Sequence, residues 1–312
     1  MKRQRIYLLL FPALLLVSGC SDSEQSEPEQ VPIELHAQGD ATVETKADAD
    51  QAITKAFGTT VFASMRSGDY TGLTSPANVK EWKIDTEVQT NGTVPLSENP
   101  TYPENGDWLY LIAVAPKASS YSDNDGKVTY TLTGQTDLMY ASQISGNRWD
   151  GNHFVPLTYK HLLTQLTFKA KKIVSNGLTV KVNKITVTAM NSVTLALTDG
   201  ETSFSGSGEL FLELPDDGTE ISGTTATSLS NSLLLPPLTG TSDVYKLTVE
   251  TSIGTFKDLE ITPQSDGENL SFAGGTSHEI TLNIGDKELG ISSVTVSGWV
   301  PVIQNDDLNL VE

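Results

Sequence analysis

Short stretches in which apolar and polar residues alternate recur along most of the chain, and this pattern restricts it to β structure. Residues 127–133 are a clear example, with Val128, Tyr130 and Leu132 between polar neighbours. Alternation gives one apolar and one polar face, as in a half-buried strand. Turn signals at residues 91–92 and 124–126 separate such stretches and predict hairpins. No segment keeps a convincing helical period over three turns, so an all-β fold is expected.

The length of 312 residues exceeds the roughly 100–200 residues of a typical domain. The β stretches fall on either side of a polar loop at residues 142–153. We therefore predict two antiparallel β-sandwich domains in tandem, one at residues 31–155 and the other at residues 156–312.

Two apolar sets in the second half are out of phase by one residue. Leu178, Val180 and Val182 alternate, and then Ile185, Val187 and Ala189 alternate. A β-bulge adds one residue to a strand and would return the second set to the core face. We expect this bulge near residues 183–184.

The N-terminal residues have the pattern of a secretory signal. Three basic residues precede an apolar region at residues 6–17, which is too short for a stable membrane span. Residues 17–20, Val-Ser-Gly-Cys, resemble the lipobox of bacterial lipoproteins, and Cys20 is the only cysteine. This resemblance implies a signal peptide at residues 1–19, cleavage before Cys20, and acyl chains on Cys20 that anchor it in outer-membrane lipid.

The charge of the chain excludes some classes of partner. Its formal net charge is −19, and loss of the three basic residues of the signal moves it by three to −22. Phosphates would repel such a chain, so we expect no nucleic-acid binding. An anionic membrane surface would not attract it either.

The segment after Cys20 is predicted to be a tether followed by a removable strand. Residues 20–30 are acidic and lack apolar side chains beyond the cysteine, so they should stay solvated. Val31, Ile33 and Leu35 then alternate with polar residues, and Pro32 predicts that this strand lies at a sheet edge or begins beside one. Residues 39–50 are polar, as in an exposed loop that proteases can cut. Residues 31–46 therefore form a candidate detachable unit.

Two motifs in the middle of the chain resemble the fimbrillin-like proteins of anaerobic Gram-negative bacteria of the Bacteroidota type. They are Leu-Met-Tyr-Ala at residues 138–141 and the strand motif at residues 159–168. Residues 44–47 and 294–299 also fit. The resemblance implies two transthyretin-like β-sandwich domains, no enzymatic activity, and export as a surface lipoprotein that assembles with other subunits into type V fimbriae.

The resemblance also implies an assembly mechanism. A trypsin-like surface protease would cut between Lys46 and Ala47, and the lost strand would leave a groove for a strand from the next subunit. The family's usual cut follows Arg, so a protease that requires Arg would leave this chain as an anchor or cap subunit. Residues 301–312 are either the donated strand or the last strand with a tail.

Cofactor and metal sites lack support in the sequence. The four histidines are far apart and show no zinc-ligand spacing. The Asp and Asn residues at 123–125 fail the calcium-loop pattern, which favours a hairpin turn. The sequence contains no Gly-x-Ser-x-Gly motif, which would have indicated a hydrolase. We therefore expect no cofactor, no metal and no catalysis.

The alternative function is glycan binding by a surface lipoprotein. Trp149 lies in the polar loop 147–152, where an exposed indole could stack on a sugar ring. The competing interpretation places Trp108 and Trp299 in the core and Trp149 as a cap on a domain edge.

Overall fold

A computed structural model of the chain describes residues 30–39, 53–74, 80–174, 177–240, 243–262, 271–285, 288–297 and 299. These residues form twenty β-strands and no helix, which confirms the predicted all-β class. Within them, no helix is long and apolar enough to cross a membrane. The predicted lipidation site Cys20, the predicted cut between Lys46 and Ala47, and residues 301–312 lie outside the described residues.

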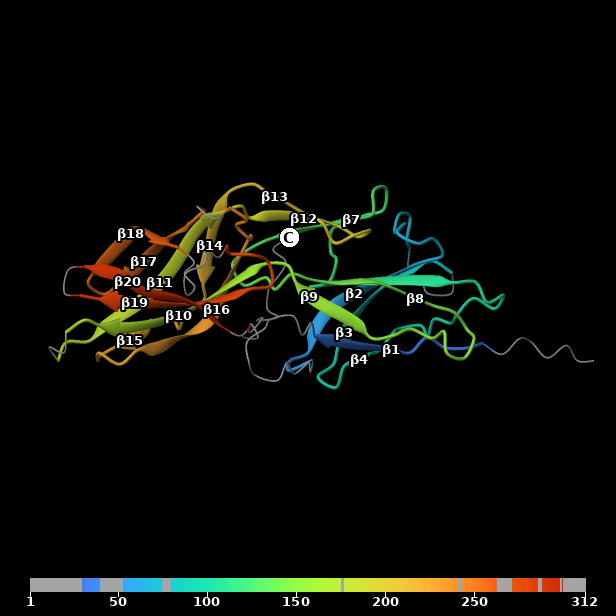
Figure 1. Cartoon of the computed structure of the whole chain (residues 1–312), viewed down its shortest axis with the longest axis horizontal. Coiled ribbons are helices and arrows are strands. Elements are labelled where there is room, and N and C mark those ends of the chain that lie inside the picture. Colours follow the sequence, from blue (N-terminus) through green and yellow to red (C-terminus); the bar gives the residue numbers. More distant parts are fainter. Residues whose placement is uncertain are drawn as a thin grey trace, which may run out of the picture.

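The molecule is elongated, with the early strands gathered toward one end and the late strands toward the other (Figure 1). The first sheet has seven strands in the order β3-β2-β5-β8-β9-β1-β4. Its strands are β1 (Leu35–Gly39), β2 (Phe57–Ser64), β3 (Trp82–Val88), β4 (Thr93–Val94), β5 (Leu109–Ala115), β8 (Met139–Gly146) and β9 (Leu157–His161).

The two ends of this sheet come together. β3 and β4 stand at opposite ends of the strand order, yet a short turn joins them, in which Gln89 N donates to Thr93 O at 2.9 Å. The sheet therefore curls around its own core. This core is formed by buried side chains that include Leu35, Val61, Trp82, Leu111, Leu157 and Tyr159.

A second, four-stranded sheet combines strands from both halves of the chain. Its order is β13-β12-β7-β6, with β6 (Tyr121–Ser122), β7 (Lys127–Thr131), β12 (Ser192–Ala196) and β13 (Thr202–Ser205). Gly126 N donates to Ser122 O at 3.0 Å, so the predicted hairpin between residues 122 and 127 is confirmed. The apolar cluster under this sheet continues from Phe62 of β2 to Leu282 of the second half, so one core joins the two ends.

The remaining strands form two sheets at the other end. One has the order β16-β10-β19-β20 and the other β14-β11-β17-β18, with β15 paired to β11. Their strands are β10 (Thr164–Lys172), β11 (Val180–Ala189), β14 (Gly208–Leu212), β15 (Thr219–Ile221), β16 (Thr227–Leu235), β17 (Tyr245–Thr251), β18 (Gly254–Ile261), β19 (Ser277–Ile284) and β20 (Leu289–Ser297). Most pairs are antiparallel, but β10–β19 and β1–β9 are parallel.

The predicted bulge is confirmed. The register between β11 and β17 shifts between Val182 and Lys184, and the side chains of Val182 and Ile185 on either side of the shift are both fully buried. The division into domains at residues 31–155 and 156–312 stays a prediction. The change from the first sheet to the later ones falls between β9, which ends at His161, and β10, which begins at Thr164.

Candidate functional site

The predicted removable strand lies inside the first sheet. β1 pairs with β4 on one side, where Leu35 faces Val94, and with β9 on the other, where Ala37 faces Leu157. The strand is therefore not itself an edge, although it lies beside the short terminal strand β4. Because both sides of β1 are paired, its loss would open a slot with unpaired main chain on two sides.

The chain before β1 is also hydrogen-bonded. Ile33 N donates to Pro100 O, and Tyr102 N donates to Val31 O, both at 2.9 Å. Pro32 lies between these bonds in an isolated antiparallel bridge to Thr101. Because Ile33 supplies the donor, the missing N–H of Pro32 does not interrupt the pairing.

The apolar side chains of this segment enter the core as their alternation predicts. Ile33, Leu35 and Ala37 are 6%, 3% and 7% exposed, and Glu34 and His36 between them are exposed. Val31 is partly buried against the same core cluster. Each large apolar side chain that is fully buried stabilises the fold by about 1.5–3 kcal/mol.

Gly92 lets the turn between β3 and β4 approach β1 closely. Ala37 N donates to Gly92 O at 2.7 Å, and a Cβ added at Gly92 would lie 2.7 Å from Ala37 O. The φ of Gly92 is +79°, a conformation that glycine adopts without strain. This turn therefore closes over the end of the slot that Ala37 occupies.

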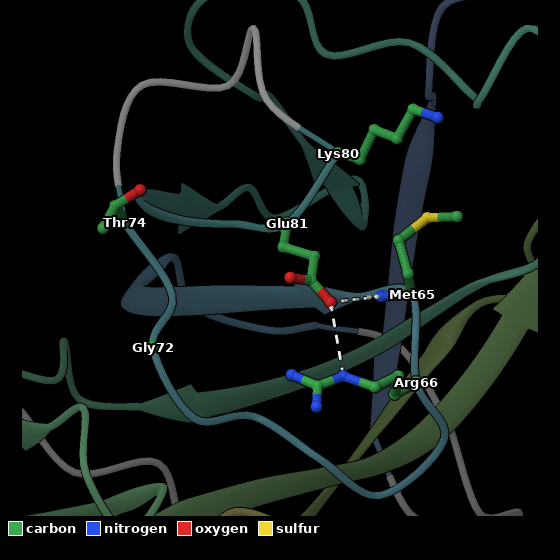
Figure 2. A pocket seen from close by; sticks show the side chains of 6 residues that line it. All are labelled: Met65, Arg66, Gly72, Thr74, Lys80 and Glu81. Atoms are coloured by element: carbon green, nitrogen blue, oxygen red, sulfur yellow. Dashed lines mark hydrogen bonds and ion pairs between the residues drawn. The ribbon is translucent and has the colours of Figure 1, made fainter.

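Arg66 is the arginine nearest to the predicted cut, and the structure holds it in place. Its guanidinium lies 2.8 Å from Asp69 and 3.8 Å from Glu81, and Glu81 also accepts from Met65 N at 3.2 Å (Figure 2). Arg66 O accepts from Asp69 N, and Arg66 N donates to Ser64 Oγ at 3.1 Å. A hydrogen-bonded turn is a poor protease substrate because the chain cannot extend without breaking those bonds.

The same residues border a shallow, open hollow of about 480 Å³, lined by Met65, Arg66, Gly72, Thr74, Lys80 and Glu81 (Figure 2). The guanidinium of Arg66, at the edge of this hollow, is already paired with Asp69 and Glu81. We assign the hollow no catalytic role.

His161 ends β9 at the passage to the later sheets. Its Nδ1 lies 2.8 Å from Asp137 Oδ1, and its ring stacks on Trp299 with 3.8 Å between ring centroids. His161 is therefore a polar residue with a hydrogen-bond partner at the end of a strand. Trp299 packs against the large core, so Trp299 lies in the predicted environment.

Of the other three tryptophans, two are exposed and one is buried, which differs from the interpretation that placed Trp108 in the core. Trp108 is 44% exposed, so its assignment to the core was wrong. Trp108 immediately precedes β5, and the first residue of that strand, Leu109, takes the position that faces the core. Trp149 is 56% exposed, and Trp82 is buried.

The histidine that burial affects most is His278, which is 1% exposed. Burial disfavours its charged form and lowers its pKa to about 4. Its Nε2 lies 3.0 Å from Thr276 Oγ1. No group of three or more potential metal-ligating side chains occurs among the residues that the structure describes.

Comparison with models of known families assigns most of the chain to one family. Residues 41–299 match the model of a family described as fimbrillin-like. No curated protein is significantly similar in sequence.

Solved structures give the same fold. A candidate cell adhesion protein from Bacteroides uniformis has a TM-score of 0.57 at 17% identity, over 86% of this chain and 98% of its own. A second candidate cell adhesion protein, from Bacteroides ovatus, has a TM-score of 0.58 at 14% identity, over 89% of this chain and 100% of its own. At these identities the two structures establish the fold alone.

Proposed function

Because the chain belongs to the fimbrillin-like family, we propose that it is a structural subunit of surface fimbriae that assembles by exchange of its first strand. It reaches the outer membrane as a lipoprotein acylated at Cys20. A trypsin-like surface protease then cuts between Lys46 and Ala47, and a strand from another subunit replaces residues 31–39.

The observation that supports this proposal most strongly is the position of β1. It lies between β9 and β4, and its side chains Leu35 and Ala37, together with Ile33 just before it, fill the core of the first sheet. Removal would leave unpaired backbone groups beside an apolar trough, which is a template for strand addition. The cut loop follows β1 directly in the sequence, so one cleavage would separate the strand from the rest of the chain.

The slot also limits which strand can replace β1. A donor must place large apolar residues at the positions of Ile33 and Leu35 and a small one at the position of Ala37, where Gly92 comes close. In residues 301–312, Leu308 and Leu310 have the spacing of Ile33 and Leu35, whereas Glu312 would then stand at the position of Ala37, so this segment matches two of the three positions. We therefore propose residues 301–312 as the donated strand.

Whether the subunit belongs to the stalk or to the anchor depends on one peptide bond. Cleavage after Lys46 would free the slot and allow polymerisation. If Lys46 stays uncut, β1 keeps the slot closed, and the subunit can anchor or cap a fimbria through Cys20. The carboxylates that pair with Arg66 make that residue an inferior alternative.

Limited trypsin treatment of the folded protein tests this proposal. We expect one early product that begins at Ala47, followed by polymers seen by size-exclusion chromatography and electron microscopy. Lys46→Ala should block both changes, and Arg66→Ala, the matched control, should leave them intact. A product trimmed at Ala47 that loses residues 31–46 and stays monomeric would refute the stalk role. An uncut Lys46 in protein recovered from cells would assign the anchor role.

A further inference from the structure

The loop that follows β8 is largely exposed and is held by hydrogen bonds within itself. Asn147 N donates to Asn152 O at 2.8 Å, and Asn152 N donates to Trp149 O at 2.9 Å. The side chain of Asn147, 3% exposed, accepts from Trp149 N at 3.0 Å. A loop held in this way loses little conformational entropy when a ligand binds.

The indole of Trp149 is fixed within this loop. A Cβ added at Gly106 would lie 2.6 Å from the indole Nε1, so the glycine allows the ring to rest on the 106 backbone. The guanidinium of Arg148 lies 5.4 Å from the indole and donates a hydrogen bond to Glu104 O. The ring is thus supported by its neighbours and still 56% exposed.

The surroundings of the ring are polar. Asp150, Asn152 and His153 in the same stretch are exposed, and Asp107 is exposed beside Gly106. These side chains offer hydrogen-bond donors and acceptors in the same two segments that present the flat face of the indole. A pyranose ring has the matching form, with a C–H face for the indole and hydroxyl groups at its rim. A protein partner would need a wider apolar area than one indole.

The local charge selects among sugars. Three exposed carboxylates, Glu104, Asp107 and Asp150, belong to the two segments that meet at the indole, and the guanidinium of Arg148 lies 5.4 Å from the ring. This excess of negative charge opposes uronic and sialic acids. A neutral hexopyranose is the ligand that fits.

We propose that Trp149 and its loop form a stacking site for a neutral hexopyranose unit of a glycan. Figure 1 shows the loop after β8 at the end of the molecule remote from the later strands, where a large polymer could reach it. The site does not include β1 or the cut loop. It therefore operates in the monomer, whether or not the proposed strand exchange occurs.

Titration of the full-length protein tests this site. The probes are neutral polysaccharides (a β-glucan, an α-mannan and a galactan) and the anionic polygalacturonate, with calorimetry and tryptophan fluorescence as readouts. We expect saturable binding of at least one neutral probe and weakening by about tenfold or more in Trp149→Ala. Trp149→Phe, which keeps a flat ring, should retain part of the affinity. Phe211→Ala removes an exposed aromatic on β14, 41% exposed, and should bind as the wild type does.

Circular dichroism and thermal melting would show that each variant is folded. The proposal is overturned if no neutral probe binds, if only polygalacturonate binds, or if folded Trp149→Ala binds as tightly as the wild type. Because every arm uses the uncut monomer, these results are independent of the outcome of the trypsin experiment.

Discussion

Leu35→Ala is the substitution that best tests whether β1 is an integral part of the folded subunit. Leu35 is 3% exposed, pairs with Val94 of β4, and belongs to the core cluster of the first sheet. Truncation of a buried leucine to alanine costs about 2–5 kcal/mol. A domain with a total stability of about 5–15 kcal/mol would lose a large fraction of it.

His36→Ala is the matched control on the same strand. His36 is the next residue, faces solvent and pairs with Thr93 through its main chain. Exposed substitutions of this kind usually change stability by less than about 0.5 kcal/mol. The two variants therefore separate loss of core packing from a general disturbance of β1.

Guanidinium unfolding of uncut protein, followed by tryptophan fluorescence, measures the difference. We expect a lower midpoint for Leu35→Ala with an unchanged slope, and no shift for His36→Ala. Equal midpoints for Leu35→Ala and the wild type would mean that β1 does not fill the core, and the slot argument would fail. Addition of a peptide of residues 31–39 to protein cut after Lys46 should raise the midpoint again, and the same peptide with Leu35→Ala should raise it less.

Three other predictions concern single contacts. Gly92→Ala places a Cβ 2.7 Å from Ala37 O at a φ of +79° and should lower the free energy of unfolding by about 1–3 kcal/mol in chemical denaturation. The loss should exceed that of Gly72→Ala, where φ is +66° and nothing lies within 4 Å of the added Cβ. Equal losses would contradict the close approach. Tyr140→Phe removes the 2.9 Å bond from its hydroxyl to Leu197 O and should lower the unfolding free energy by about 1 kcal/mol; an unchanged value would mean that this bond adds no net stability. Burial lowers the pKa of His278 from 6.5 to about 4, so the unfolded chain binds its proton first, and the unfolding free energy should fall by about 3 kcal/mol as pH drops from 6.5 to 4. His278→Gln should flatten that profile in urea titrations at several pH values, and an unchanged slope would assign the effect to other groups.

The elements that the sequence predicts well are those that depend on neighbouring residues. The hairpin at Asn124–Gly126 needs a residue with positive φ, which Gly126 supplies at +60°. The bulge near Asn183 follows from a phase shift that is visible in the apolar pattern. Burial of Ile33 and Leu35 follows from alternation alone.

Long-range pairing could not be predicted in the same way. β7 pairs with β12, with Tyr130 opposite Val193, although more than sixty positions separate them in the sequence. Alternation gives each strand two faces but does not name its neighbour. The motif at residues 159–168 also contains a change of sheet, because Leu162 N donates to Leu138 O, and at Thr164 the chain enters the next sheet.

The glycan site shows the same limit for side chains. The loop around Trp149 could be identified from its polar composition, but its support by Gly106 is a contact between segments more than forty positions apart. The prediction that Trp108 lies in the core was wrong because, where a strand begins, only one of two adjacent apolar residues faces the core. At the start of β5 that residue is Leu109.

The pairing of β1 gives the proposed slot a direction. β1 runs parallel to β9 and antiparallel to β4, so a replacing strand restores both ladders only if it runs in the same direction as β1. A shift of one residue would turn its apolar side chains away from the core. The closeness of Gly92 to Ala37 fixes which residue must be small. Direction, register and residue size together would let the slot select its donor before any other surface of the two subunits meets.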